Sequence, residues 1–421
     1  MTSTIKVNNV QNQCGQNIIN ENSNTITIGA SGDTIALASG ASQTGFGRTG
    51  TVDWQTGSIK TGTFTAVSGE GYFVNTSGGA VTMNLPASPS AGDIVSLKDY
   101  LYTFATNNLT INFKKDHDSI GINLDTNLIF KILSKTFSNI KLTKILNEND
   151  LNKLAERKPE LVFSGIKYFK FKTKTIWLNE FLDINNINYI NSKKSSYNNA
   201  NDKSLAKIIM QKNGINTPNF FIAKPKQYSN ALSLPINFPL FVKPLNGGDS
   251  IGIDQNSVVR NFKDFEKKIF DVQLNQNSSC IAESYLSGKE FTVGIIQDDL
   301  TRRLIAMPVE IVVQKNSDGN RILDYNIKKN DLEEVCAIHD PIVYKKVSKL
   351  AMLAFKLLKG RMFGRIDIKM DGKGIPNFIE ANLMPGLKKG YFFRCCSINL
   401  QITYEQMITK ISKNALNHPR R

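Results

Sequence analysis

The stretch from residue 364 to 386 contains the side chains best suited to chemistry. It holds two runs in which polar and apolar residues alternate, 364–370 and 375–383, on either side of a glycine-containing turn segment. Alternating runs around such a turn predict a β-hairpin. We take Lys373 and Gly374 as a two-residue turn, and this choice fixes which strand positions face each other.

In that register Asp367 pairs with Glu380, and Arg365 pairs with Asn382. Side chains alternate between the two faces of a strand, so all four lie on one face. Two carboxylates, an amide oxygen and an arginine are a set that suits Mg²⁺ bound to polyphosphate. The opposite face is predicted to be apolar, with Ile366, Ile368, Met370, Ile379, Ala381 and Leu383. The alternative is a half-exposed hairpin whose polar face is only solvated.

A change in composition near residue 125 divides the 421-residue chain. Residues 1–113 are rich in Thr, Ser, Gly and Asn, with short alternating runs and closely spaced turn signals, which predict an all-β module. From residue 128 the pattern mixes helices and strands. We therefore expect a multidomain chain: an all-β module at 1–125, a small α/β subdomain at 126–200 and a larger α+β domain at 201–421.

The net charge of +16 is unevenly distributed. Residues 1–113 carry four basic and six acidic side chains, which leaves 48 basic and 30 acidic side chains for the remainder. A surplus of this size suits a phosphate-bearing ligand, and nucleic acid is the alternative partner. The lysines are scattered and are not interleaved with aromatic residues, which disfavours nucleic acid and favours a solvated basic surface.

Cysteines, histidines and apolar runs argue against several classes of protein. The five cysteines show no C-x-x-C spacing and the three histidines no metal-binding pattern, which disfavours a structural zinc site. No apolar run is long enough to span a membrane, and no signal peptide opens the chain. We expect a cytoplasmic protein with free thiols and no membrane partner.

Hydrophobic periodicity predicts the elements of the second part of the chain. The expected helices are 128–137, 150–157, 175–182, 202–213, 262–270 and 344–359. The expected strands are 140–146, 160–164, 188–190, 238–243, 280–285 and an antiparallel pair, 290–297 with 304–310. The strand that ends at Lys243 runs into a glycine-rich loop, and such a loop can surround phosphates with backbone N–H groups.

From Asn201 onward the chain resembles the ATP-grasp superfamily and, within it, the D-alanine–D-alanine ligases. The phrases that carry the resemblance come in the family's order: DKSLAKIIMQKNGINTP, FPLFVKPLNGGDSIGI, AESYLSGKEFTVGII, ILDYNIKK and GRIDIKMDGKGIPNFIEANLMPGL. The resemblance implies an α+β fold with a small α/β subdomain and two ATP-grasp subdomains. It also implies an ATP-dependent ligase, which phosphorylates a carboxylate and lets an amine attack the acyl phosphate.

The resemblance assigns a role to each matching residue. Those implied to bind the nucleotide are Lys203, Lys243, Gly248, Ser250, Glu283, Leu286, Glu290 and Lys328. The lysines and the glycine-rich loop would contact phosphates, Glu283 and Leu286 would meet adenine, and Glu290 would bind the ribose. Asp367, Glu380 and Asn382 match the ligands of two Mg²⁺ or Mn²⁺ ions. Catalysis would use Arg365 at the transferring phosphoryl group, Lys328 on a closing loop, and the backbone N–H of Gly386 at the oxyanion.

The amino-acid side of the family's site is altered in this sequence. The family's N-terminal glycine-rich loop, which carries a glutamate, has no equivalent here. Its Thr-Ser-x-Ser run is replaced by Leu-Lys-Lys-Gly-Tyr at 387–391, and Asp249 stands at the first serine of its Gly-Ser-Ser. The nucleotide side is complete. The expected substrate is therefore an amino acid or peptide whose identity stays open.

The first part of the chain resembles structural modules of marine bacteriophage tail and virion proteins over about residues 4–125. The phrases are TITIGASGDTIALASG and TGFGRTGTVDWQTGSIKTGTFTAVSGEGYFVNTSGGAVTMNLP. Strand pairing between chains would favour a trimer, whereas ligases of this kind favour a dimer. Two alternatives stay open: a virion-associated structural protein with an inactive ATP-grasp part, and a reading frame that joins two unrelated sequences.

Overall fold

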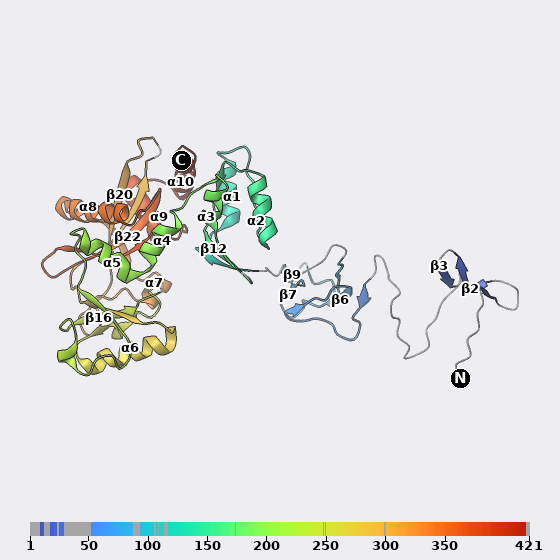
Figure 1. Cartoon of the computed structure of the whole chain (residues 1–421), viewed down its shortest axis with the longest axis horizontal. Helices are drawn as coiled ribbons and strands as arrows, with labels where there is room; N and C mark the ends of the chain where they lie inside the picture. The colour runs from blue at the N-terminus through green and yellow to red at the C-terminus, as the bar shows by residue number, and fades with distance from the viewer. Residues whose placement is uncertain are drawn as a thin grey trace. The chain divides into compact units, whose positions relative to one another are not determined.

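The computed structural model describes residues 9–11, 17–22, 25–28, 52–86, 93–104, 107, 109–112, 117–172, 174–246, 248, 250–298 and 300–417. The chain divides into two compact units, Met1–Asn112 and Phe113–Arg421 (Figure 1). Each unit has hydrophobic clusters of its own.

The first unit is built from strands wherever the structure describes it. An antiparallel sheet consists of β1 (Asn9–Gln11), β2 (Asn17–Asn22) and β3 (Thr25–Ile28). Two parallel sheets follow: β4 (Asp53–Trp54), β6 (Glu70–Val74) and β8 (Ser96–Asp99) form one, and β5 (Phe64–Thr65), β7 (Val81–Asn84) and β9 (Leu109–Asn112) the other. Because alternate strands pair in parallel, successive stretches stack as in a solenoid. Alternate residues such as Tyr72, Val74, Val81 and Met83 fill the core between them.

The second unit begins with a small α/β region. An antiparallel sheet contains β10 (His117–Gly121), β12 (Ile166–Phe171) and β13 (Thr175–Trp177), and β11 (Leu161–Val162) pairs in parallel with β14 (Asn188–Tyr189). The helices of this region are α1 (Thr126–Ser134), α2 (Glu148–Glu156), α3 (Leu178–Ile184) and α4 (Lys194–Asn201). Leu151, Phe169 and Leu182 lie in its core.

A four-stranded antiparallel sheet follows, in the order β15-β18-β16-β17. Its strands are β15 (Phe220–Ala223), β16 (Leu240–Pro244), β17 (Val258–Val259) and β18 (Cys280–Ser284). Helix α6 (Phe262–Gln276) lies along this sheet and buries Phe265 and Ile269 against it (Figure 1). Before the sheet comes α5 (Lys203–Lys212), which Asp202 caps by accepting from the N–H groups of its first turn.

A five-stranded antiparallel sheet forms the other half of the larger domain, in the order β21-β20-β19-β22-β23. Its strands are β19 (Glu290–Gln297), β20 (Leu304–Val312), β21 (Glu334–Ala337), β22 (Phe363–Met370) and β23 (Pro376–Asn382). The helices α7 (Tyr325–Asn330), α8 (Pro341–Leu357), α9 (Tyr391–Leu400) and α10 (Tyr404–Asn417) accompany it.

Helices α8 and α9 take up the two faces of this sheet. Phe291, Val293 and Ile295 of β19 pack in the cluster of α8. The alternate position, Gly294, faces α9 so closely that an added Cβ would lie 2.7 Å from the Cβ of Cys395. A glycine is therefore required for α9 to pack directly on this strand. The α9 face also carries the polar groups described below.

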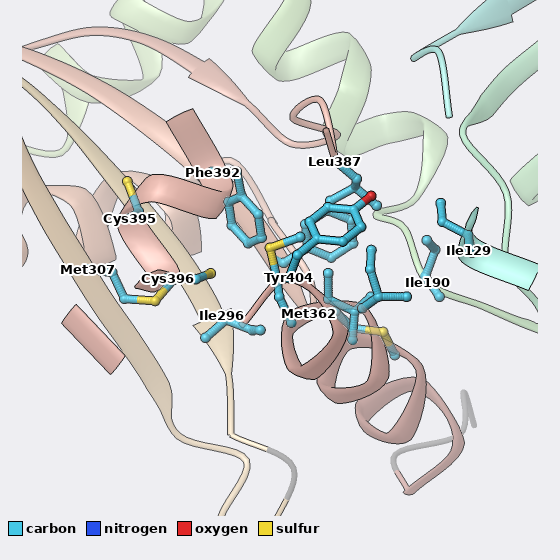
Figure 2. Packing of buried hydrophobic residues seen from close by; sticks show 14 of the residues in the cluster. Ile129, Ile190, Ile296, Met307, Met362, Leu387, Phe392, Cys395, Cys396 and Tyr404 are labelled. Atoms are coloured by element: carbon cyan, nitrogen blue, oxygen red, sulfur yellow. The ribbon is translucent and has the colours of Figure 1, made fainter. Parts of the chain in front are cut away.

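The core on the α9 side joins the small α/β region to the large sheet. Figure 2 shows Ile129 and Ile190 of the small region beside Tyr404, with Phe392, Ile296 and Met307 farther along the same cluster. The small region is thus anchored through buried apolar side chains.

Two predicted elements of the small region are wrong. Residues 140–146 form no strand; Ile140 and Ile145 instead reach from an irregular segment into two different hydrophobic clusters. Residues 175–182 are not one helix, because β13 (Thr175–Trp177) pairs with β12 before α3 begins. The β-branched and aromatic residues at 175–177 favour a strand, and tertiary pairing prevails over helical periodicity there. The other predicted helices and strands from 128 to 359 are present, with ends shifted by a few residues.

Candidate active site

The predicted pairing on the hairpin is confirmed, although the predicted turn is wrong. Arg365 faces Asn382, and Asp367 faces Glu380. The turn is not the two-residue one that was expected, because the N–H of Asp371 bonds the carbonyl of Ile375 at 3.0 Å and three residues lie between them. Gly374, with φ of 75°, supplies the left-handed conformation that such a turn needs.

A β-bulge at Ile379 restores the predicted register. Ile368 pairs with Phe378, one position off the pairing of Asp367 with Glu380, so Ile379 is the extra residue. Phe378 is completely buried in the core, and Ile379 lines the pocket instead. The prediction that Ile379 belongs to the apolar face is therefore wrong. The other residues predicted for that face are buried: Ile366, Ile368, Met370, Ala381 and Leu383.

A pocket of about 830 Å³, part of it open to solvent, brings most of the predicted site residues together. They come from strands of both large sheets, from α7 and from the loops between. The predicted residues that line it are Lys243, Ser250, Glu283, Leu286, Glu290, Lys328, Arg365, Asp367 and Glu380. Polar groups that converge from separate elements on one concavity are the usual form of a ligand site.

Four predicted residues lie outside this lining. Lys203 is buried beside the pocket, with its Nζ 3.4 Å from the carbonyl of Leu245, and its charge acts on Glu380. Asn382 donates to Asp367 over 3.4 Å. Gly248 and Gly386 are exposed. Gly247 and Asp249, in the same glycine-rich loop, lie outside the described residues.

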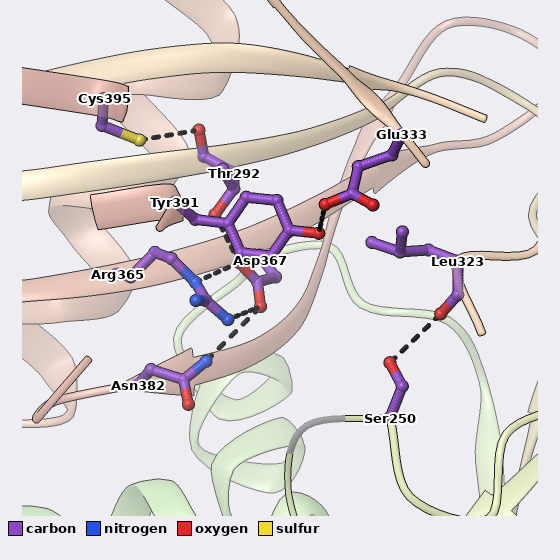
Figure 3. A network of polar contacts seen from close by, with 9 residues as sticks. All are labelled: Ser250, Thr292, Leu323, Glu333, Arg365, Asp367, Asn382, Tyr391 and Cys395. Carbon is purple, nitrogen blue, oxygen red and sulfur yellow. Dashed lines mark hydrogen bonds and ion pairs between the residues drawn. The ribbon is translucent and has the colours of Figure 1, made fainter. Parts of the chain in front are cut away.

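Arg365 and Asp367 form a bidentate ion pair on the floor of the pocket. The Nε and one terminal nitrogen of Arg365 each lie 2.9 Å from a different carboxylate oxygen of Asp367 (Figure 3). Thr292, directly opposite Asp367 on β19, donates its hydroxyl to the same carboxylate at 2.6 Å. Burial works against the charge of Arg365, but Asp367 outweighs it and raises the pKa of the guanidinium.

Glu283 is bridged by two buried lysines. Its Oε1 lies 3.2 Å from the Nζ of Lys207 and 3.0 Å from that of Lys243. Burial would raise the pKa of Glu283, and the two ammonium groups lower it overall. Burial lowers the pKa of Lys207 to about 8. Sequence reasoning missed Lys207, although its position four residues after Lys203 places both on one face of α5.

Lys369 is a second residue that sequence reasoning missed. It stands directly opposite Glu290 between β22 and β19, and its Nζ lies 2.8 Å from the Glu290 carboxylate. Both residues line the pocket. Alternation along β22 places Lys369 on the face of Arg365 and Asp367, which was a usable signal.

Glu380 lies among positive charges. Burial would raise the pKa of its carboxyl, but Lys203, Lys243, Lys328 and Arg365 outweigh burial and lower the pKa to about 2. An ionised carboxylate at this point can accept either a cation or hydrogen bonds from a ligand.

The donor set of the hairpin suits Mg²⁺. Among the described residues no group of three His, Cys, Asp or Glu side chains could hold a metal by itself. The hairpin offers two carboxylates, Asp367 and Glu380, with the amide of Asn382 beside them. Mg²⁺ is usually bound by one or two carboxylates together with the phosphates of a substrate, so the set fits a metal that arrives with a nucleotide.

Two further findings concern the chain as a whole. The four described cysteines, Cys280, Cys336, Cys395 and Cys396, are free thiols, as predicted for them. None of the described helices has both the length and the apolar character needed to cross a membrane.

Together, the lysines, carboxylates and arginine that the two antiparallel sheets bring to one pocket form a site that suits a nucleotide polyphosphate. Residues 209–413 match the family described as the D-ala D-ala ligase C-terminus. The chain is 26% identical over 240 residues to D-alanine–D-alanine ligase B of Clostridium perfringens, covering 56% of this chain and 75% of that protein. It is 28% identical over 239 residues to the D-alanine–D-alanine ligase of Aquifex aeolicus, with coverages of 56% and 75%.

Solved structures show the same fold. The D-alanine–D-alanine ligase from Bacillus anthracis aligns with a TM-score of 0.52 at 19% identity, over 70% of this chain and 95% of that one. Its complex with ATP aligns with a TM-score of 0.51 at 20% identity, over 70% and 94%. The predicted ATP-grasp, D-alanine–D-alanine ligase-like character of the second part is confirmed. The phage-like character of the first part stays a prediction.

Proposed function

We propose that this chain is an ATP-dependent, ADP-forming carboxylate–amine ligase of the D-alanine–D-alanine ligase type. The observation that carries the proposal is the pocket in which Lys243 and Glu283 of one sheet meet Arg365, Asp367 and Glu380 of the other. Such a site can hold a nucleotide polyphosphate and stabilise the charge that develops during phosphoryl transfer.

The nucleotide would be oriented along the pocket by residues of both sheets. Glu283 and Leu286, at the end of β18, would meet the base, and Glu290 the ribose hydroxyls. Lys243 and Ser250 would bind phosphate oxygens, with Lys203 supporting them from the side. The salt bridges between Lys369 and Glu290 and between Lys243 and Glu283 hold these groups in place before a ligand arrives.

The chemical step would take place beside the hairpin. Arg365 and Lys328 would stabilise the terminal phosphoryl group as it moves to the substrate carboxylate. Asp367, Glu380 and Asn382 would hold two Mg²⁺ or Mn²⁺ ions, which neutralise phosphate charge when bound. The amine then attacks the acyl phosphate, the new C–N bond forms, and phosphate leaves. The backbone N–H of Gly386 would donate to the oxygen of the tetrahedral intermediate.

The substrate class follows from the relatives. Proteins similar to this chain are named D-alanine–D-alanine ligases, so an amino acid or dipeptide is the first class to test. Where the family carries its Thr-Ser-x-Ser run, this chain places Tyr391 in the pocket lining. This difference supports an acceptor other than D-alanine.

The domain arrangement is also a proposal. We infer three parts, 1–125, 126–200 and 201–421, although β10, within the first range, pairs with β12 of the second. The first part would be a structural module like those of phage virions. The phrases quoted above support this module, and it would make the protein virion-associated if it assembles. Without such assembly the cytoplasm is the expected location. A trimer through the first part, or a dimer through the ligase part, would follow.

The proposal is tested by measuring ADP release from the full chain with Mg-ATP over a panel of D- and L-amino acids and dipeptides. We expect turnover that depends on the added amino acid. The Asp367→Ala/Glu380→Ala double variant is the control and should lose it. ATP binding without stimulated turnover on any member of the panel would favour the alternative of a virion protein with an inactive ATP-grasp part.

A further inference from the structure

Tyr391 is the first residue of α9 and lines the pocket, and the proposed mechanism gives it no role toward the nucleotide. Its hydroxyl donates to Oε1 of Glu333, as Figure 3 shows. Glu333 is only 7% exposed and lies between α7 and β21. The phenol is thus hydrogen-bonded to the segment that follows α7, the helix that contains Lys328.

The ring of Tyr391 contacts two cations from two different elements. The guanidinium carbon of Arg365, on β22, lies 5.3 Å from the ring centroid. The Nζ of Lys328, on α7, lies 5.9 Å from the same centroid. Both distances are in the range in which an aromatic face attracts a cation.

A second polar contact joins α9 to the chain that follows α7. Arg394, three residues after Tyr391 and therefore on the same side of the helix, pairs with Asp331 at 2.5 Å. Asp331 ends α7 in a left-handed conformation, with φ of 53°. Helix α9 therefore contacts the chain just after α7 at two residues, Asp331 and Glu333, and the ring of Tyr391 lines the pocket beside these contacts.

We propose that Tyr391, fixed by Glu333, is a positioning residue that holds Lys328 and Arg365 toward the terminal phosphates of the nucleotide. Arg365 is already anchored by Asp367, so the ring matters most for Lys328, whose helix is only six residues long. Burial raises the pKa of Tyr391, and its bond to Glu333 adds to the rise, so the phenol stays protonated and keeps donating.

The test is calorimetric binding of Mg-ATP and of AMP to the full chain. Two cation–π contacts correspond to roughly a 5- to 30-fold change in affinity. We therefore expect Tyr391→Leu to weaken Mg-ATP about 10-fold and to leave AMP, which lacks the terminal phosphates, within about 2-fold. Tyr391→Phe keeps the ring and loses only the tie to Glu333, so it should weaken Mg-ATP less. Equal weakening of ATP and AMP by either variant would overturn the proposal.

The coupling with Lys328 gives a second readout. If Tyr391 acts through Lys328, the Tyr391→Leu/Lys328→Met double variant should weaken Mg-ATP by clearly less than the product of the two single effects. If the double variant instead weakens Mg-ATP by the full product of the two single effects, the ring of Tyr391 acts only by packing and not through Lys328. Tyr404→Leu is the matched control: Tyr404 is another buried tyrosine of this unit, its ring meets Phe393 rather than a cation, and both nucleotides should bind within about 2-fold of wild type.

This inference rests on the proposed function for the identity of the nucleotide, and the two can fail separately. A wild-type chain that binds Mg-ATP but shows no amino-acid-stimulated ADP release contradicts the ligase and leaves the Tyr391 comparison decisive. A folded wild-type chain that does not bind Mg-ATP overturns both.

Discussion

Glu283 is the acid on which the nucleotide end of the site depends. It is 3% exposed, and it shares one oxygen between Lys207 and Lys243. A buried carboxylate between two ammonium groups offsets part of the hydration that both lysines lose on burial. Removing the shared acid therefore costs more than removing one of the two bases.

Glu283→Ala should lower the free energy of unfolding by about 3–5 kcal/mol, because it removes the carboxylate that contacts two buried lysines. Lys207→Met should cost less, roughly 1–2 kcal/mol, because Lys243 still neutralises Glu283 and the methionine fills the space. Urea unfolding measures both. Glu405→Ala, which breaks the exposed pair with Lys135, is the control and should change stability by less than about 1 kcal/mol. Equal losses of stability in Glu283→Ala and Lys207→Met would contradict the idea that Glu283 neutralises both lysines.

Glu380 gives a prediction about pH. Its folded pKa is depressed to about 2, so the stabilisation from its charge is complete above the unfolded value near 4.5 and is lost as pH falls toward 2. Glu380→Gln should therefore be less stable than wild type at pH 6, and the difference should shrink between pH 4.5 and 2.5. Urea midpoints of the nucleotide-free protein across that range measure it. If the difference in stability between wild type and Glu380→Gln stays constant with pH, the lowered pKa of Glu380 is refuted.

The residues that alternation alone placed in the site differ in one physical respect from the missed residue Tyr391. Arg365, Asp367 and Glu380 lie on two strands joined by a short turn, so local alternation is enough to bring them together. Tyr391 reaches the site only through packing between distant segments. The pair of Tyr391 with Glu333 spans 58 positions of the chain and carries no local signal.

Among the elements, the hairpin has the predicted strand pairing but not the predicted turn. The pairing of Asp367 with Glu380 was predicted from a two-residue turn, and the structure reaches it with a three-residue turn and a bulge. A bulge is not visible in alternation alone, since it appears only as one residue, Ile379, on the unexpected face. Residues 175–177 were assigned to a helix for a different reason, because periodicity does not show that they pair with β12.

Deleting Ile379 tests the role of the bulge. Without the extra residue, Ile368 can still pair with Phe378 and Asp367 with Glu380, so the two strands form a regular ladder and both side chains keep their faces. We therefore expect the deletion to bind Mg-ATP within about 3-fold of wild type, measured by calorimetry. Ile379→Ala, which keeps the bulge, should do the same. A fall of about 10-fold or more in the deletion alone would show that the bulge itself, and not only the pairing, sets the site.

At the scale of the whole molecule, two units with separate cores share one chain. The change in composition indicates two parts, but the strand at 117–121 pairs with β12 and so belongs with the second unit. Composition cannot show this, because the pairing joins segments about fifty residues apart. The order of the ATP-grasp phrases, in contrast, was readable because each phrase is local.

The separate cores predict that residues 113–421 fold without the first unit. The buried clusters of the second unit are made from its own side chains. The excised piece should bind Mg-ATP within about 2-fold of the full chain and keep its helix and strand content, measured by calorimetry and circular dichroism. Loss of folding in the piece alone would mean that the first unit stabilises the second.

If this chain joins a carboxylate to an amine through an acyl phosphate, one oxygen atom of the carboxylate must pass to the released phosphate. The full chain is incubated with Mg-ATP, a carboxylate substrate labelled with ¹⁸O and an amine acceptor, and the released phosphate is analysed by mass spectrometry. We expect one ¹⁸O atom in the phosphate for each new amide bond. Released phosphate without ¹⁸O would mean that water, and not the substrate carboxylate, accepts the phosphoryl group, and it would contradict the ligase.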